Sequence, residues 1–243
     1  MSRDRYWWGS TEVWDSKIMG LAILVAIAVT SGTLFAFSGQ VETSSPAVEQ
    51  GFSLESVSGL LWVSIGWIFV VGSITTGQTL TKEMGSESIQ HVALRTLGNT
   101  LEYGLMTLLL IWMHGLYCNA AAATLFGSIY MISRIFYPVF YGYYGEFTVM
   151  VEFSTQPGYV AKGFLLTGLL YTLLTGGDLA AEFASVAYQP LILIGSWLVF
   201  ALVFGMLVGM PLFLNFKAGA VRKLRMDASR SDDPAQDSQG LPQ

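Results

Sequence analysis

Charged residues are scarce in this 243-residue chain, in which Asp, Glu, Lys and Arg together make up 12% of the sequence. Soluble domains carry about 25% charged residues, so the deficit excludes a chain built mainly from soluble domains. Hydrophobic residues make up 53%, and the mean hydropathy is +0.53. These values predict an integral membrane protein of one domain with short loops. The small net charge of -5 predicts no nucleic-acid-binding surface.

Cysteine is almost absent, and familiar metal and nucleotide motifs are missing. Cys118 is the single cysteine, so the chain cannot form an internal disulfide. There is no P-loop, GxGxxG, HExxH or Cys/His cluster. The two histidines, His91 and His114, are more than 20 positions apart, and we expect an interfacial role for the first and a packing role for the second. We therefore expect no metal site.

Long apolar runs are what the sequence does contain, and about 20 apolar residues are enough for a helix to cross a bilayer. They predict an all-α, polytopic membrane protein with about six spans, at residues 18–38, 57–80, 92–117, 120–141, 159–175 and 189–214. The fifth predicted span is short, because Gly, Pro and acidic residues in 142–158 predict an interfacial loop before it. The polar composition of residues 227–243 predicts a disordered tail.

Basic residues are distributed unevenly between the loops, which predicts the orientation of the spans. Lys and Arg occur before the first span, at Lys82 and after the last span, whereas 39–56 and 176–188 contain none. Short loops rich in Lys and Arg stay on the cytoplasmic side. We therefore expect a multi-pass protein with both termini in the cytoplasm.

Two polar stripes interrupt the apolar pattern of the third and fourth predicted spans. In each stripe the spacing places the residues on one face of a helix. The first stripe is Arg95, Asn99, Glu102 and Tyr103, and the second is Tyr130, Arg134, Tyr137 and Tyr141. A charged group at the bilayer centre costs on the order of 3 kcal/mol, so something must compensate for these charges.

Two interpretations of the stripes follow from the residues. In the first, a buried Glu102–Arg134 pair fixes the helix register, and Asn99 forms an interhelical hydrogen bond. In the second, the stripes line a pocket for an anionic, peptide-like ligand. Arginine forks bind carboxylates, Asn and Glu bind amide and amine groups, and tyrosine hydroxyls donate without adding charge.

The pattern Arg-x-x-x-Asn-x-x-Glu-Tyr, followed after a hairpin by Tyr-x-x-x-Arg-x-x-Tyr-x-x-x-Tyr, resembles the MAPEG family, the membrane-associated proteins of eicosanoid and glutathione metabolism. The similarity is greatest to its leukotriene-C-synthase and microsomal glutathione transferase branches. It implies a four-helix core over residues 56–176. Residues 1–55 would add an interfacial segment, a transmembrane helix and a loop, and 177–226 would add a last transmembrane helix before the tail 227–243.

The resemblance implies a left-handed bundle that forms a homotrimer and binds glutathione, as co-substrate, between subunits near the cytoplasmic side. The implied glutathione-binding residues are Arg95, Asn99, Glu102, Tyr103, Arg134, Tyr137 and Tyr141. The implied activity is that of a membrane transferase or peroxidase acting on lipophilic electrophiles that enter from the lipid. The expected location is the endoplasmic reticulum or another intracellular membrane.

The sequence departs from the family pattern at the residue that would stabilise the glutathione thiolate. The family has an arginine after the last tyrosine, but no Lys or Arg lies between Tyr141 and Pro157, and Thr148 stands about where the arginine is expected. Lys162 is the cation that could replace it, so Tyr137, Tyr141 and Lys162 are the candidate catalytic residues. The alternative is a non-catalytic MAPEG-like protein, either a lipid-binding accessory protein or a structural subunit of a membrane complex.

Overall fold

The computed structural model describes residues 16–83, 87–144, 148–184 and 186–203, and within these ranges the regular structure is helical. The helices are α1 (Ser16–Ala36), α2 (Ser38–Glu42), α3 (Leu54–Glu83), α4 (Glu87–Tyr117), α5 (Ala120–Tyr144), α6 (Val149–Thr175), α7 (Leu179–Phe183) and α8 (Gln189–Phe200). The chain divides into two units, 1–200 and 201–243, and only 201–203 of the second are described. The helices named here all belong to the first unit. The predicted all-α class is confirmed.

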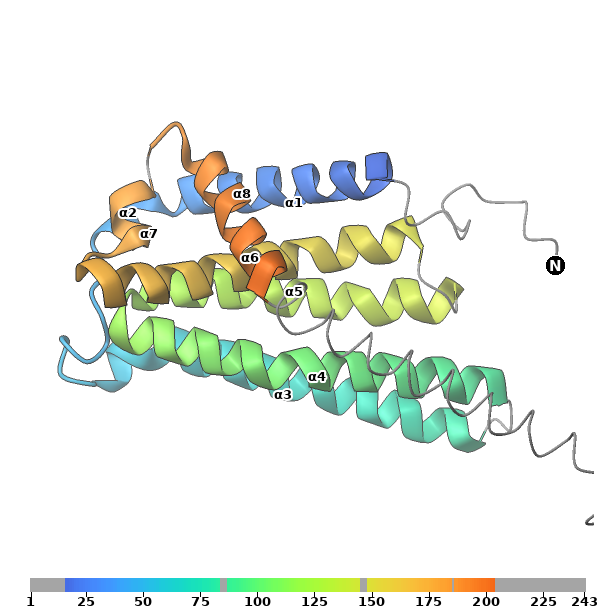
Figure 1. The fold of residues 1–243 in the computed structure, drawn as a ribbon. Coiled ribbons are helices and arrows are strands. Elements are labelled where there is room, and N and C mark those ends of the chain that lie inside the picture. Colours follow the sequence, from blue (N-terminus) through green and yellow to red (C-terminus); the bar gives the residue numbers. More distant parts are fainter. Residues whose placement is uncertain (1–15, 84–86, 145–147, 185, 204–243) are drawn as a thin grey trace, which may run out of the picture. The chain divides into compact units, whose positions relative to one another are not determined.

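Four of the described helices are long and apolar enough to cross a membrane. Their apolar windows are Met19–Ala36, Leu54–Lys82, Ala120–Tyr143 and Val149–Thr175. Figure 1 shows α1, α3, α4, α5 and α6 running side by side in alternating directions, as short connections between spans require. The prediction of a multi-pass membrane protein is therefore supported by four helices.

The other two predicted spans, 92–117 and 189–214, are not among these four helices. α4 is 31 residues long but carries Glu87, Arg95 and Glu102 and falls outside the apolar class. α8 is described as a helix of 12 residues, and most of the predicted 189–214 span beyond it, like the predicted tail 227–243, lies outside the described residues. The six-span arrangement thus stays a prediction.

The predicted loop at 142–158 is too long at both ends, and α5 already continues to Tyr144. α6 begins at Val149 and continues through Pro157 to Thr175, so it is 27 residues long rather than short. Proline is tolerated inside membrane helices because neighbouring groups satisfy the backbone acceptor that it leaves free. Lys162 consequently lies in the middle of this helix, not at its start as the sequence predicted.

Asn119 holds together the end of the bundle where α4 turns into α5. Its side-chain oxygen accepts a hydrogen bond from the backbone N–H of Ala122 (2.8 Å), which caps α5. Its side-chain nitrogen donates to the backbone oxygen of Val41 (2.9 Å) and to a carboxylate oxygen of Asp178 (2.7 Å). Asp178 in turn accepts from the N–H of Ala180 at the start of α7. One amide therefore ties α2, α5 and α7 together.

α6 is the central helix of the described unit and packs against α1, α4, α5 and α8. Two of its glycines permit close approaches to neighbouring helices. A Cβ atom on Gly158 would lie 2.6 Å from the hydroxyl of Ser133 on α5, and one on Gly163 would lie 2.6 Å from the backbone oxygen of Ser196 on α8. α8 crosses α6 at this point (Figure 1), so small residues set the contact between the two helices.

We expect Gly163→Ala to lower the thermal stability of the protein in detergent. The methyl group would meet backbone atoms of α8, and overpacking of this kind costs about 1–3 kcal/mol. Gly72→Ala in α3 is the matched control, because no atom lies within 4 Å of its Cβ position, and alanine favours a helix over glycine. Equal melting temperatures for the two variants would contradict the close α6–α8 contact.

Candidate functional site

Arg134 on α5 is a fully buried cation held by one hydrogen bond. Its exposed fraction is 0%, and Nη1 donates to the side-chain oxygen of Asn99 on α4 at 2.9 Å. The guanidinium carbon also lies 5.3 to 5.8 Å from the ring centres of Tyr103, Tyr130 and Tyr137. Such contacts stabilise a cation by about 0.5–2 kcal/mol. The aromatic faces therefore compensate for only part of its lost hydration.

Lys162 on α6 is a second fully buried cation in the same region. Its Nζ lies 4.3 Å from the ring centre of Tyr103 and 4.4 Å from that of Tyr159. The ring of Phe200 on α8 is 4.9 Å away, and the ring of Tyr130 is 5.7 Å away. Tyr103 and Tyr130 thus contact both cations. The two cations and their contacts form what we call the cation cluster, namely Asn99, Tyr103, Tyr130, Arg134, Tyr137, Tyr159, Lys162 and Phe200.

The cation cluster has more hydrogen-bond donors than acceptors. Within the described part of the chain, Nε and Nη2 of Arg134 and Nζ of Lys162 have no hydrogen-bond partner. The buried hydroxyls of Tyr130 and Tyr137 have none either. Buried polar groups are almost always paired, and an unpaired buried charge is far more costly than an unpaired neutral group. The arrangement is therefore suited to an anion with several acceptor oxygens.

Both cations lie far from the ends of their helices. Lys162 is 13 residues from each end of α6, by 162 − 149 and 175 − 162, which is about 20 Å at a rise of about 1.5 Å per residue. Arg134 is 10 residues from the nearer end of α5, by 144 − 134. Charges at such depth in membrane helices face the protein interior and commonly mark functional sites.

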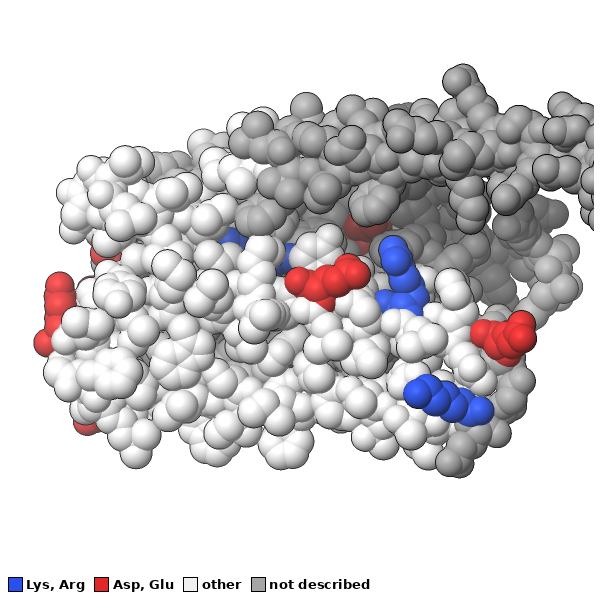
Figure 2. All heavy atoms as spheres, turned by 60° about the horizontal axis from the view of Figure 1, so that its bottom comes forward, with Lys and Arg blue, Asp and Glu red and all other residues white. Residues whose placement is uncertain are grey.

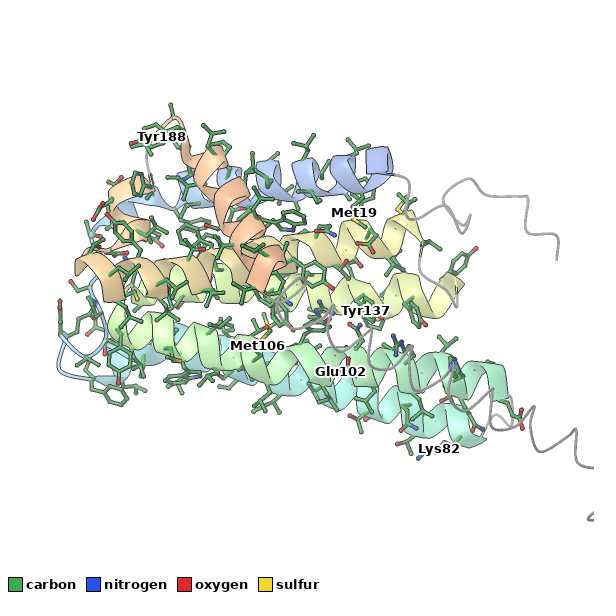
Figure 3. All side chains as sticks on the ribbon, viewed as in Figure 1. Met19, Lys82, Glu102, Met106, Tyr137 and Tyr188 are labelled. Carbon is green, nitrogen blue, oxygen red and sulfur yellow. The ribbon has the colours of Figure 1, made fainter. Side chains whose placement is uncertain are left out.

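The structure separates the first predicted stripe into half-buried and exposed members. Asn99 and Tyr103 belong to the cation cluster, whereas Arg95 and Glu102 are exposed on α4. Figure 3 shows Glu102 on α4 and Tyr137 on α5 at a similar level along the bundle. Arg95 lies one helical turn before Asn99 on α4, at the edge of the cluster.

The predicted register-fixing pair between Glu102 and Arg134 does not form. Glu102 is exposed, and Arg134 binds Asn99 instead. The interhelical hydrogen bond expected of Asn99 is present, but its partner is the arginine. Figure 2 shows one face of the molecule, on which charged side chains are scattered among many uncharged ones.

The second predicted stripe stays together. Tyr130, Arg134, Tyr137 and Tyr141 are all buried on α5. The Tyr137 and Tyr141 rings stack with their centres 5.5 Å apart. Both pack with Val151, near the start of α6.

The sequence did not reveal Tyr159 and Phe200 as contacts of Lys162. Tyr159 is three residues before Lys162, a spacing that places the two side chains on one helix face, and this was the available signal. Phe200 had no local signal, because it reaches Lys162 through the packing of α8 on α6.

The described chain offers few other reactive groups. Cys118 is buried, and burial raises the pKa of its thiol, which makes it a poor nucleophile. Among the described residues, no group of three His, Cys, Asp or Glu side chains could hold a metal ion. His114 is buried in the bundle, as predicted, and His91 is exposed.

Thr148, where the family arginine was expected, is the N-cap residue of α6. It has an extended backbone and a buried side chain, and its hydroxyl has no partner among the described residues. It precedes Val151, which packs with Tyr137 and Tyr141.

Comparison with known proteins finds no match for this chain among family models, curated proteins or solved structures.

Proposed function

We propose that this chain is a MAPEG-like membrane protein that binds glutathione at the cation cluster. It would use glutathione as co-substrate toward lipophilic electrophiles, as a transferase or peroxidase. The observation that carries the proposal is the burial of Arg134 and Lys162 at mid-helix with N–H groups that no described residue accepts. Glutathione would supply a carboxylate acceptor for the donors of Arg134, together with a thiol whose anion Lys162 would stabilise.

The roles follow from the positions of the donors. Arg134 donates to Asn99 through Nη1, and its Nε and Nη2 have no partner among the described residues. These two nitrogens would bind a carboxylate through two parallel hydrogen bonds. Tyr103 lies between the two cations, and the Tyr137 hydroxyl is free to donate. Lys162 would act on the thiolate as a positive charge, with Tyr137 and Tyr141 as the other catalytic residues.

The exposed charges of α4 support the proposal of a homotrimer. Arg95 and Glu102 lie within the length of a helix that packs against three apolar, membrane-length helices, α3, α5 and α6, yet their side chains are exposed in one chain. Charged groups are rarely left facing lipid. A neighbouring subunit covering α4 would remove them from lipid and place them against the bound peptide. The lipophilic substrate would then enter laterally from the membrane.

Glutathione binding is tested by thermal unfolding of the detergent-purified protein. We expect millimolar glutathione to raise the melting temperature, because a ligand that binds only the folded state stabilises it by RT ln(1 + [L]/Kd). Arg134→Leu and Arg95→Ala should each remove the shift. Lys82→Ala is the matched control, since Lys82 is an exposed cation at the end of α3 that contacts no cluster residue.

The ligand itself provides a second control. Glutathione esterified at both carboxylates should give no shift, because Arg134 would lose its charged acceptor. An unchanged melting temperature with glutathione in the unmodified protein would refute the proposed ligand.

A second candidate function is a non-catalytic MAPEG-like protein, an accessory or structural subunit of a membrane complex. Its specific support is Thr148, a buried neutral residue at the position where the resemblance calls for the thiolate-stabilising arginine. In this case glutathione, or another small anion, would bind without reacting.

A further inference from the structure

Two hollows join end to end along α5, on a side of the helix away from the cation cluster. One, of about 550 Å³, is lined by α1, α2, α3 and α5, and the other, of about 430 Å³, by α1, α5 and α6. Thr33, Ile129 and Ile132 line both, so together they form one groove, here called the α5 groove. No residue of the cation cluster lines it. In Figure 1, α5 lies between α1 and α3.

The walls of the α5 groove are apolar and exposed. Val29 of α1, Phe37 between α1 and α2, and Ile132 and Phe136 of α5 are all exposed in the described chain. Four helices of this unit have membrane length and apolarity. A groove between such helices opens to lipid, where a hydrocarbon chain is the ordinary occupant.

The floor of the groove has hydroxyl groups, but they are already bonded. Thr124 and Ser128 each donate to a backbone oxygen one turn earlier, at 2.8 Å. Ser133 donates to the backbone oxygen of Tyr130 at 2.7 Å. These three hydroxyls therefore already have hydrogen-bond partners. An apolar chain can lie on this floor without burying an unsatisfied polar group.

One end of the groove is polar and acidic. Gln40, Gln50 and Glu55 line it there. The sequence has no Lys or Arg from Ile18 to Thr81, and Glu42 and Glu49 lie in the same connection. This end therefore complements a positively charged amine and disfavours a headgroup with a net negative charge.

The length of the groove agrees with one leaflet of a bilayer. The larger hollow follows α5 from Ala120 to Ile132, a separation of 12 residues by 132 − 120. At a rise of about 1.5 Å per residue this is about 18 Å. Half of a hydrocarbon core of about 30 Å is about 15 Å. The smaller hollow continues toward Phe140 and leaves room for the end of a longer acyl chain.

We propose that the α5 groove binds one phospholipid with an amine-bearing headgroup. An acyl chain lies on the floor formed by Thr124, Ser128 and Ile132, and the ammonium group lies beside Glu55. The site is separate from the proposed glutathione site and does not depend on it.

Native mass spectrometry of the full chain in mild detergent tests this site. The delipidated protein is mixed with equal amounts of dioleoyl phosphatidylethanolamine and dioleoyl phosphatidylglycerol. We expect one phosphatidylethanolamine to be retained per chain, in clear excess over phosphatidylglycerol. Ile132→Trp fills the groove and should lower the retained lipid about tenfold. Ile135→Trp is the matched control, because Ile135 is similarly exposed on α5 (46% against 50%) but does not line the groove.

The headgroup is tested separately with a carboxylate variant. Glu55→Gln should reduce the preference for phosphatidylethanolamine about threefold, the effect of one partly exposed charge. Glu87→Gln removes an exposed carboxylate at the start of α4 that does not line the groove, and it should leave the preference unchanged. Equal retention in Ile132→Trp and Ile135→Trp would overturn the site. Equal retention of the two lipids by the unmodified protein would overturn the headgroup assignment, and a changed subunit number in Ile132→Trp alone would assign the groove to a subunit interface instead.

Discussion

Replacing Lys162 with methionine should make the unliganded protein more stable. In the described structure, Nζ has no hydrogen-bond partner and is fully buried. Burying an ion destabilises the folded state by several kcal/mol even after relaxation. Each aromatic contact stabilises the ion by only about 0.5–2 kcal/mol. Methionine has a similar length, and its sulfur keeps favourable contacts with aromatic rings. We expect a gain of about 1–3 kcal/mol, measured as a higher melting temperature in detergent without glutathione.

Lys82→Met is the control for this experiment. It removes the same charge at the exposed end of α3 and should leave the melting temperature unchanged. If Lys162→Met instead lowers stability, Lys162 has an anionic partner in the protein itself, and its role is structural. A gain in stability is the expected signature of a residue retained for binding or chemistry rather than for folding.

The helices and the second polar stripe could be predicted because their signals are local. Apolar runs define helices of membrane length, and four of them have the expected composition. The spacing of Tyr130, Arg134 and Tyr137 placed them on one helix face, and the structure buries all three. Helical periodicity therefore gave the correct buried face of α5.

The error at α6 had a local cause as well. Gly145, Pro157 and the acidic residues near them are loop signals in soluble proteins, but in a membrane bundle the helix continues through Pro157. The polar face of α6 was missed for the same reason. There Gln156 donates to Glu152 at 2.9 Å and accepts from Trp197 of α8 at 3.2 Å.

Contacts between distant segments could not be predicted from periodicity. The sequence offered Glu102 as the partner of Arg134, because opposite charges on adjacent helices suggest a pair. The structure uses Asn99 instead, because the rotation of α4 about its axis directs Asn99 inward and leaves Glu102 exposed. That rotation depends on the packing of α4 against α3, α5 and α6 together.

The proposed enzyme should lose at least about tenfold in rate when Lys162 becomes alanine, with glutathione binding nearly unchanged. A thiol with a pKa near 8.5 is only a few per cent thiolate at neutral pH, and each pKa unit requires about 1.4 kcal/mol of differential stabilisation. Nζ of Lys162 is buried and has no hydrogen-bond partner in the described structure, so a proton held there would be free to act on a thiolate. A loss in kcat without a change in the glutathione-induced melting shift identifies an interaction made with the reacting sulfur rather than with the peptide. The measurement is the conjugation rate with a model aromatic electrophile.

Thr148→Arg provides the converse test in the same assay. The side chain of Thr148 is buried, close in sequence to Val151, which packs with Tyr137 and Tyr141, so an arginine here would bring a cation toward the tyrosine hydroxyls. If Lys162 activates the thiol, Thr148→Arg should restore part of the rate in the Lys162→Ala background, because one positive charge replaces another near the sulfur. Activity that arises only in Thr148→Arg, with none in the natural chain, would mean that the protein binds glutathione without catalysis. Equal rates in the natural chain and in Lys162→Ala would remove the lysine from the mechanism.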